Sequence, residues 1–288
     1  MDTPRRSFLS GIAASIFAPK SAEAIIDNLT DQRRRMLEAY VFITEEAQRS
    51  IQGSAVLIDP HNGWLALSAH QADLGKTINL KGSFSRTSHL IAELPPMCAK
   101  VMHASQSDQL GFSHDIALAR IEPESMPILN QHLNRYPERS VLQLTDSTPE
   151  GATGRELFVA GYPSRIKTLL GSPLNPLQIN NAAPITISIN ETVGHACNIF
   201  GSLTYPGLVA GGISGGGVFE FTRNNVPILV GIANMGTINA HPNHARLGFT
   251  HISALGPILS SLGINTPSAG RIAECQPKSF FSSTGLVP

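Results

Sequence analysis

Between residues 40 and 250 the chain consists mainly of short apolar runs separated by polar turns. Runs of this length lack the spacing of an amphipathic helix and are typical of buried or half-buried β-strands. The Asn62-Gly63 pair, which ends one of the turns, indicates a hairpin. The pattern therefore predicts an all-β sandwich or barrel, with strands at residues 40–44, 55–58, 64–67, 77–80, 116–121, 141–144, 157–160, 185–189, 217–221 and 228–233.

Helical spacing occurs only at the two ends of this β region. Residues 28–38 predict a short helix that Thr30 can cap. A second helix is predicted near the end by one apolar face, made of Ile252, Leu255, Ile258, Leu259 and Leu262. The polar stretch 130–153 is the expected connection between two β halves. Residues 266–288 show no period, and we expect them to form an unpacked, disordered tail.

The first 24 residues have the features of an export signal. Arg5 and Arg6 precede an apolar run over residues 8–18, which is too short to cross a bilayer. Ala22 and Ala24 place small residues where a signal peptidase cleaves. The segment resembles a twin-arginine signal, which implies a bacterial protein exported to the periplasm or the medium. An ordinary amphipathic N-terminal helix is the alternative interpretation.

Charge and cysteine content exclude several classes of function. Lys plus Arg (21) equals Asp plus Glu (21), so no net field favours nucleic acid or anionic lipid. The basic cluster at residues 33–35 is expected on a solvated helix face. No later run is long enough for stable membrane insertion. Cys98, Cys197 and Cys275 lack metal-ligand spacing, and they are interpreted as small buried hydrophobes or as one disulfide plus a free thiol.

Glycines frame a single serine at residues 211–217, with the sequence Gly-Gly-Ile-Ser-Gly-Gly-Gly. Glycine allows a sharp turn that exposes the Ser214 hydroxyl and directs neighbouring N–H groups at one point. An oxyanion hole requires this arrangement, because negative charge develops on the substrate carbonyl oxygen during acyl transfer. A glycine-rich turn with a passive serine would have the same sequence.

Two further segments supply partners for that serine. The apolar run at residues 64–67 leads to His70, and histidine can accept and return a proton near neutral pH. Asp115 leads directly into the apolar run at residues 116–121. A carboxylate that enters a buried strand needs a partner, and an imidazole N–H is a suitable one.

The order His70, Asp115, Ser214 resembles that of the trypsin-like serine peptidases, particularly their HtrA-type branch. Residues 67–70 (Leu-Ser-Ala-His) are similar to the family's Thr-Ala-Ala-His, and residues 115–118 reproduce its Asp-Ile-Ala-Leu. Residues 212–216 are similar to its Gly-Asp/Asn-Ser-Gly-Gly. Two weaker similarities follow in the same order. Residues 231–236 are similar to the strand that lines the family's substrate cleft, and residues 248–253 are similar to the last strand before its C-terminal helix.

The resemblance implies a domain at residues 40–265 with two six-stranded antiparallel β-barrels and a C-terminal helix. The first barrel is expected at about residues 40–130 and the second at about 150–250, after an N-terminal helical segment at residues 25–39. His70, Asp115 and Ser214 would form the catalytic triad of a serine endopeptidase acting on polypeptides without a cofactor. The N–H groups of Gly212 and Ser214 would form the oxyanion hole. Substrate-binding positions would be Leu208, Asn234 and Gly236.

Three departures from the family affect these expectations. Ile213 stands where the family usually has an acid or amide, so activation through a charge pair with a new N-terminus is excluded. Leu208 stands where trypsin has its specificity acid, which predicts a small or apolar residue at the cleavage site instead of Lys or Arg. Gly217 replaces a common proline, which loosens the loop.

Three other interpretations use some of the same residues. The two barrels could bind peptides without cutting them. Residues 212–216 also fit the G-x-S-x-G turn of α/β-hydrolase esterases and lipases, but only Glu220 and Glu274 follow as acids and strand–helix alternation is missing. His241 and His244, near His251, are a possible metal pair, but Pro242 disfavours a helix that would align them, so a solvated loop is expected.

Overall fold

The computed structural model describes residues 31–45, 52–71, 73–82, 94–105, 114–148, 152, 155, 157–162, 165–168, 185–195, 197–203, 208–237 and 246–264. The predicted signal segment, the cap Thr30, the pair His241 and His244, Cys275 and the predicted tail lie outside these residues.

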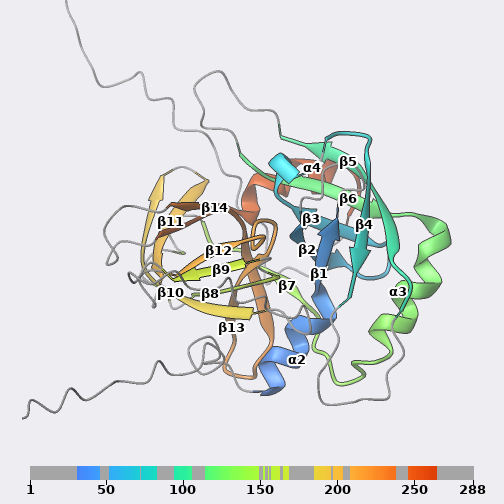
Figure 1. Ribbon diagram of the computed structural model, residues 1–288, viewed down its shortest axis with the longest axis horizontal. Helices are drawn as coiled ribbons and strands as arrows, with labels where there is room; N and C mark the ends of the chain where they lie inside the picture. Colours follow the sequence, from blue (N-terminus) through green and yellow to red (C-terminus); the bar gives the residue numbers. More distant parts are fainter. Residues whose placement is uncertain are drawn as a thin grey trace, which may run out of the picture.

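Six antiparallel strands form a closed barrel in the first half of the chain, on the right in Figure 1. The strand order is β1-β2-β3-β6-β5-β4, and β1 closes the barrel by pairing with β4. The strands are β1 (Val41–Glu45), β2 (Gln52–Asp59), β3 (Trp64–Leu67), β4 (Thr77–Lys81), β5 (Met97–Ala104) and β6 (Ala117–Ile121).

The second half of the chain forms another ring of six strands, in the order β13-β8-β10-β11-β15-β14, because β13 pairs with both β8 and β14. Its members are β8 (Leu157–Gly161), β10 (Ile185–His195), β11 (Asn198–Leu203), β13 (Gly217–Phe221), β14 (Pro227–Thr237) and β15 (Arg246–His251). The short β7 (Gln143–Leu144) adds to β14 in parallel, and β9 (Arg165–Thr168) pairs separately with β12 (Leu208–Gly211). The predicted all-β fold is confirmed.

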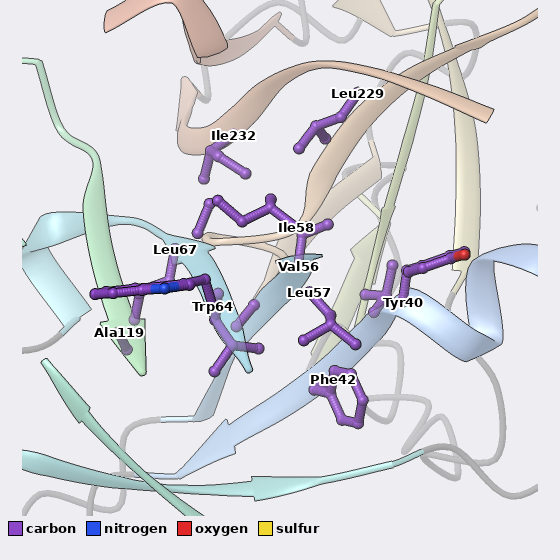
Figure 2. Packing of buried hydrophobic residues seen from close by; sticks show 14 of the residues in the cluster. Tyr40, Phe42, Val56, Leu57, Ile58, Trp64, Leu67, Ala119, Leu229 and Ile232 are labelled. Carbon is purple, nitrogen blue, oxygen red and sulfur yellow. The ribbon is translucent and has the colours of Figure 1, made fainter. Parts of the chain in front are cut away.

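The two barrels share one hydrophobic cluster. Trp64, Leu67 and Phe42 come from the first barrel, whereas Leu229 and Ile232 come from β14 of the second, and all belong to this cluster (Figure 2). Burial of apolar side chains is the main favourable term in folding. The shared cluster therefore stabilises the relative position of the two barrels and of the loops between them.

The observed helices differ from the predicted ones in two respects. The connection between the barrels contains α3 (Met126–Leu133), which the sequence analysis did not predict. A proline in its first turn is compatible with a helix start, because the missing N–H has no helical partner there. The C-terminal helix is present as η5 (Ile252–Leu255) and α4 (Gly256–Ser261). Leu262, predicted on its apolar face, is 46% exposed because the helix ends before it.

The N-terminal helix α2 (Asp31–Tyr40) precedes the first barrel and contacts the second. Arg33 donates from Nε to the side chain of Asn225 at 2.8 Å, and its guanidinium lies 4.8 Å from the centre of the Phe221 ring. Arg33 is therefore half-buried in a contact with the β13–β14 turn, and the expected solvated face is wrong for this residue. Arg35 is exposed.

Cysteine pairing and membrane segments can be stated for the part of the chain described above. Cys197 is disulfide-bonded, whereas Cys98 is free. None of the helices in the described ranges is long and apolar enough to cross a membrane.

Candidate active site

His70 follows β3 in a short 3-10 helix, η1 (Ala69–Gln71). The Ser68 hydroxyl donates to the carbonyl of Ala233 in β14 at 2.7 Å, so the end of β3 is attached to the second barrel. The His70 side chain is 47% exposed. It therefore lies where a substrate could reach it.

Asp115 stands two residues before β6 and faces His70. Its Oδ1 accepts a hydrogen bond from the His70 backbone N–H at 2.9 Å, and its Oδ2 lies 2.5 Å from Nδ1 of the ring. Both carboxylate oxygens of Asp115 thus contact His70. The structure brings together two side chains that lie 45 residues apart in the sequence.

Ser214 lies in the turn between β12 and β13. Gly212 and Gly215 have φ angles of +94° and +80°, in the left-handed region that side chains disfavour. A Cβ on Gly215 would also overlap the carbonyl oxygen of Ser54. The turn is closed by the Gly216 N–H, which donates to the Ile213 carbonyl at 2.8 Å. The glycines are therefore required by this turn.

Two groups from the first barrel hold the carbonyl oxygen of Ser214. The backbone N–H of Ser54 donates to it at 2.8 Å, and the side-chain Nε2 of Gln71 donates to it at 2.5 Å. Gln71 directly follows His70 in the chain. The segment that carries the histidine therefore contacts the residue that carries the serine hydroxyl.

Ser54 makes a second connection to the serine loop. Its buried hydroxyl donates to the Gly212 carbonyl at 3.1 Å and accepts from the Tyr162 N–H at 2.8 Å. Ile213, which occupies the family's acidic position, is 4% exposed, and its side chain packs against Gly161 of β8. An apolar contact and neutral hydrogen bonds thus hold the loop.

The Ser214 hydroxyl and the His70 ring are not hydrogen-bonded to each other, and the hydroxyl has no other hydrogen-bond partner in the described segments. The N–H groups of Gly212 and Ser214 likewise donate to no described residue. Catalytic hydrogen bonds are often long without substrate and shorten in the complex. Gly215 does not contribute such a donor, because its N–H is bound to the Ala233 carbonyl at 2.6 Å.

The three expected substrate-binding residues lie in strands near this loop. Leu208 begins β12 and is paired with Thr168, and Gly236 in β14 is paired with Leu247. The side-chain amide of Asn234 donates to the Thr250 hydroxyl on β15 at 2.7 Å. Asn234 therefore connects two strands of the second barrel through its side chain.

Comparison with known proteins identifies the fold. The chain matches no protein-family model, and no curated protein matches it. A solved structure of HL collagenase is similar to it, with a TM-score of 0.51 over 81% of this chain and 96% of the other. The chain has a trypsin-like fold. At 14% sequence identity, the similarity to this collagenase concerns the fold alone.

Sequence reasoning missed two residues of this candidate site, Ser54 and Gln71. Their signals were present but weak: Gly53-Ser54 begins an apolar strand, and Gln71 follows the candidate histidine.

Among the described residues no group of three or more His, Cys, Asp or Glu side chains could hold a metal ion. His251 is buried, with Nδ1 2.8 Å from the Ser253 hydroxyl.

Proposed function

We propose that this protein is a serine endopeptidase that uses His70, Asp115 and Ser214. The observation that carries the proposal is the pair of hydrogen bonds between Asp115 and His70. The next residue, Gln71, binds the carbonyl of the glycine-framed Ser214. A passive serine turn would not need an oriented, half-exposed histidine next to it. Peptide hydrolysis uses these three groups together.

The proposed reaction is acyl transfer through a covalent intermediate. Ser214 Oγ attacks the carbonyl carbon of a peptide bond while His70 Nε2 takes the hydroxyl proton. His70 then gives this proton to the leaving amine, so the C–N bond breaks and an ester to Ser214 remains. A water molecule, deprotonated by the same ring, hydrolyses the ester. Asp115 holds Nδ1–H and stabilises the imidazolium, and the N–H groups of Gly212 and Ser214 bind the oxyanion.

The proposed substrate is an extended polypeptide. Gly236 would hydrogen-bond its backbone, and Leu208 would favour a small or apolar residue at the cleavage site. Peptide libraries that vary this residue test the preference, and cleavage after Lys or Arg would contradict it. The collagenase named above supports a peptidase through the shared fold only.

The test of catalysis is labelling with a fluorophosphonate probe, which reacts with activated serines. Wild-type protein should be labelled and should cleave an unfolded protein substrate, whereas Ser214→Ala should do neither. Ser261→Ala is a matched control, because this serine is exposed on α4 and should not affect labelling. Absence of wild-type labelling across pH 6 to 9 would contradict the proposal.

The second candidate function is peptide binding without cleavage. The missing hydrogen bond between Ser214 and His70 favours it, because an activated serine needs that contact during reaction. A binding protein would retain unfolded peptides equally well after Ser214→Ala and would release them uncut. Product analysis by mass spectrometry separates the two functions.

We further propose that the protein is exported from a bacterial cell. The twin-arginine-like segment at residues 1–24 supports export, and so does the disulfide at Cys197, since structural disulfides persist in oxidising compartments. Cell fractionation of a tagged full-length chain tests this, and Arg5→Lys with Arg6→Lys should retain the protein in the cytoplasm.

A further inference from the structure

We infer that Gln71 is a positioning residue, which aligns the Ser214 nucleophile with His70 through the backbone of Ser214. This inference rests on the proposed function. Gln71 has no part in the acyl transfer itself, because its side chain meets the carbonyl oxygen of Ser214 instead of the hydroxyl.

The surroundings of Gln71 indicate that its amide is directed at one acceptor. The residue is 7% exposed, and Nε2 donates to the Ser214 carbonyl. A carbonyl oxygen can only accept, so the amide nitrogen must face it. Oε1 is buried and has no hydrogen-bond partner in the described segments. The bond to the Ser214 carbonyl is therefore the only hydrogen bond that the side-chain amide makes to the described residues.

Two glycines provide the space for this side chain. A Cβ on Gly53 would overlap the Gln71 amide, and one on Gly215 would lie 2.8 Å from Oε1. Gly53 belongs to β2 and Gly215 to the serine loop. The amide therefore lies between the first barrel and the loop that it fixes.

The hydrogen bond between Gln71 and the Ser214 carbonyl can align the serine with His70 because Gln71 is the next residue in the chain after His70. Gln71 immediately follows His70 in η1, so movement of the histidine and movement of the serine backbone are coupled through one hydrogen bond. The Ser54 N–H holds the same oxygen from β2 and would remain after Gln71 is replaced. Loss of Gln71 should thus loosen the loop without unfolding it. Misplacement of a reacting group by about 1 Å can reduce a rate about 100-fold.

The experiment compares wild type with Gln71→Met, which keeps the length of the side chain and removes the donor. We expect kcat and the rate of fluorophosphonate labelling to fall about 10- to 100-fold, with KM for a peptide substrate unchanged. Gln131→Met is the matched control, because this glutamine is exposed on α3 and should leave both rates unchanged. Gln71→Glu retains the shape but presents a carboxylate to the Ser214 carbonyl, and it should be at least as slow.

The possible outcomes separate this inference from the proposed function. If wild-type protein is labelled and Gln71→Met is labelled equally fast, the inference is wrong and the proposed function stands. If wild-type protein is not labelled, the proposed function fails, and the inference fails with it. If both Gln71 variants lose folding cooperativity, or if KM rises while kcat holds, Gln71 stabilises the fold or binds substrate, and the inference is overturned.

Discussion

Asp115 binds His70 through both of its carboxylate oxygens, one at the backbone N–H and one at the ring Nδ1. The two contacts fix the carboxylate plane relative to the ring. A carboxylate accepts and does not donate, so Nδ1 carries the hydrogen, and in the neutral ring Nε2 then keeps its lone pair. This is the tautomer that a general base needs on the side facing a serine.

Replacement of Asp115 by asparagine should reduce kcat about 10⁴-fold, because the amide can donate to Nδ1 and favour the opposite tautomer. Peptide hydrolysis measured at saturating substrate gives this value. Asp146→Asn is the control, since Asp146 is exposed near β7. An Asp115→Asn variant within a few-fold of wild type would show that the carboxylate only anchors the His70 loop.

The fold was largely predictable because ten apolar runs of strand length stand between polar turns. Four of the described strands, β5, β9, β11 and β12, were not predicted, and for β5 and β11 the sequence gives a physical reason. Met97–Ala104 contains Lys100 and His103 among its apolar residues, and the side chain of Lys100 is exposed, so the run is interrupted in sequence. Asn198–Leu203 contains asparagine and glycine, which have low strand propensity. Tertiary pairing determines both strands.

The candidate site was predictable only for the residues whose chemistry is carried by their own side chains. His70, Asp115 and Ser214 have such side chains, and the structure pairs the first two. Ser54 and Gln71 act on the backbone of the serine loop. No local pattern marks a glutamine that reaches a carbonyl 143 residues away. Such contacts require the two barrels to be docked first.

Gly215→Ala should unfold the serine loop and abolish fluorophosphonate labelling. The new methyl group would overlap the Ser54 carbonyl, at a φ of +80° that alanine already disfavours. We expect a loss of roughly 2–4 kcal/mol in the free energy of unfolding, measured by urea denaturation. Gly75→Ala is the matched control: its φ is +79° with no atom within 4 Å of the new Cβ, so only the backbone strain of about 1–2 kcal/mol applies. Equal losses in the two variants would contradict the steric argument.

Thiol titration should find one reactive thiol per unfolded chain without reductant and three after reduction. Cys98 is free and half-buried, whereas Cys197 is disulfide-bonded, and the chain has one further cysteine, Cys275. Non-reducing peptide mapping should recover Cys197 in a cross-linked pair, and Cys98→Ser should leave that pair intact. Three free thiols in protein recovered from the periplasm would contradict the disulfide.

The stability of the protein should fall in mild acid because of His132 on α3. This side chain is 1% exposed, and its ring centre lies 4.8 Å from that of Phe42 and 5.3 Å from that of Tyr136. The pKa of His132 is lowered from its usual 6.5 to about 4, mainly by burial and to a smaller extent by the charges of Arg135 and Arg139. Hydrogen bonds to the backbone of Ala39 and Glu38 act in the opposite direction.

The direction of the effect follows from proton binding. Between pH 6.5 and pH 4 the unfolded chain takes up a proton at this histidine and the folded chain does not, so acid favours unfolding. Above pH 6.5 His132 is neutral in both states and does not lower the free energy of unfolding. By pH 4 its buried position has lowered that free energy by about 3 kcal/mol. His132→Gln should therefore flatten the dependence of the unfolding free energy on pH over this interval, even if it lowers stability at neutral pH. His61→Gln, in the exposed turn before β3, should keep the wild-type slope. An unchanged slope in His132→Gln would show that other groups cause the acid sensitivity.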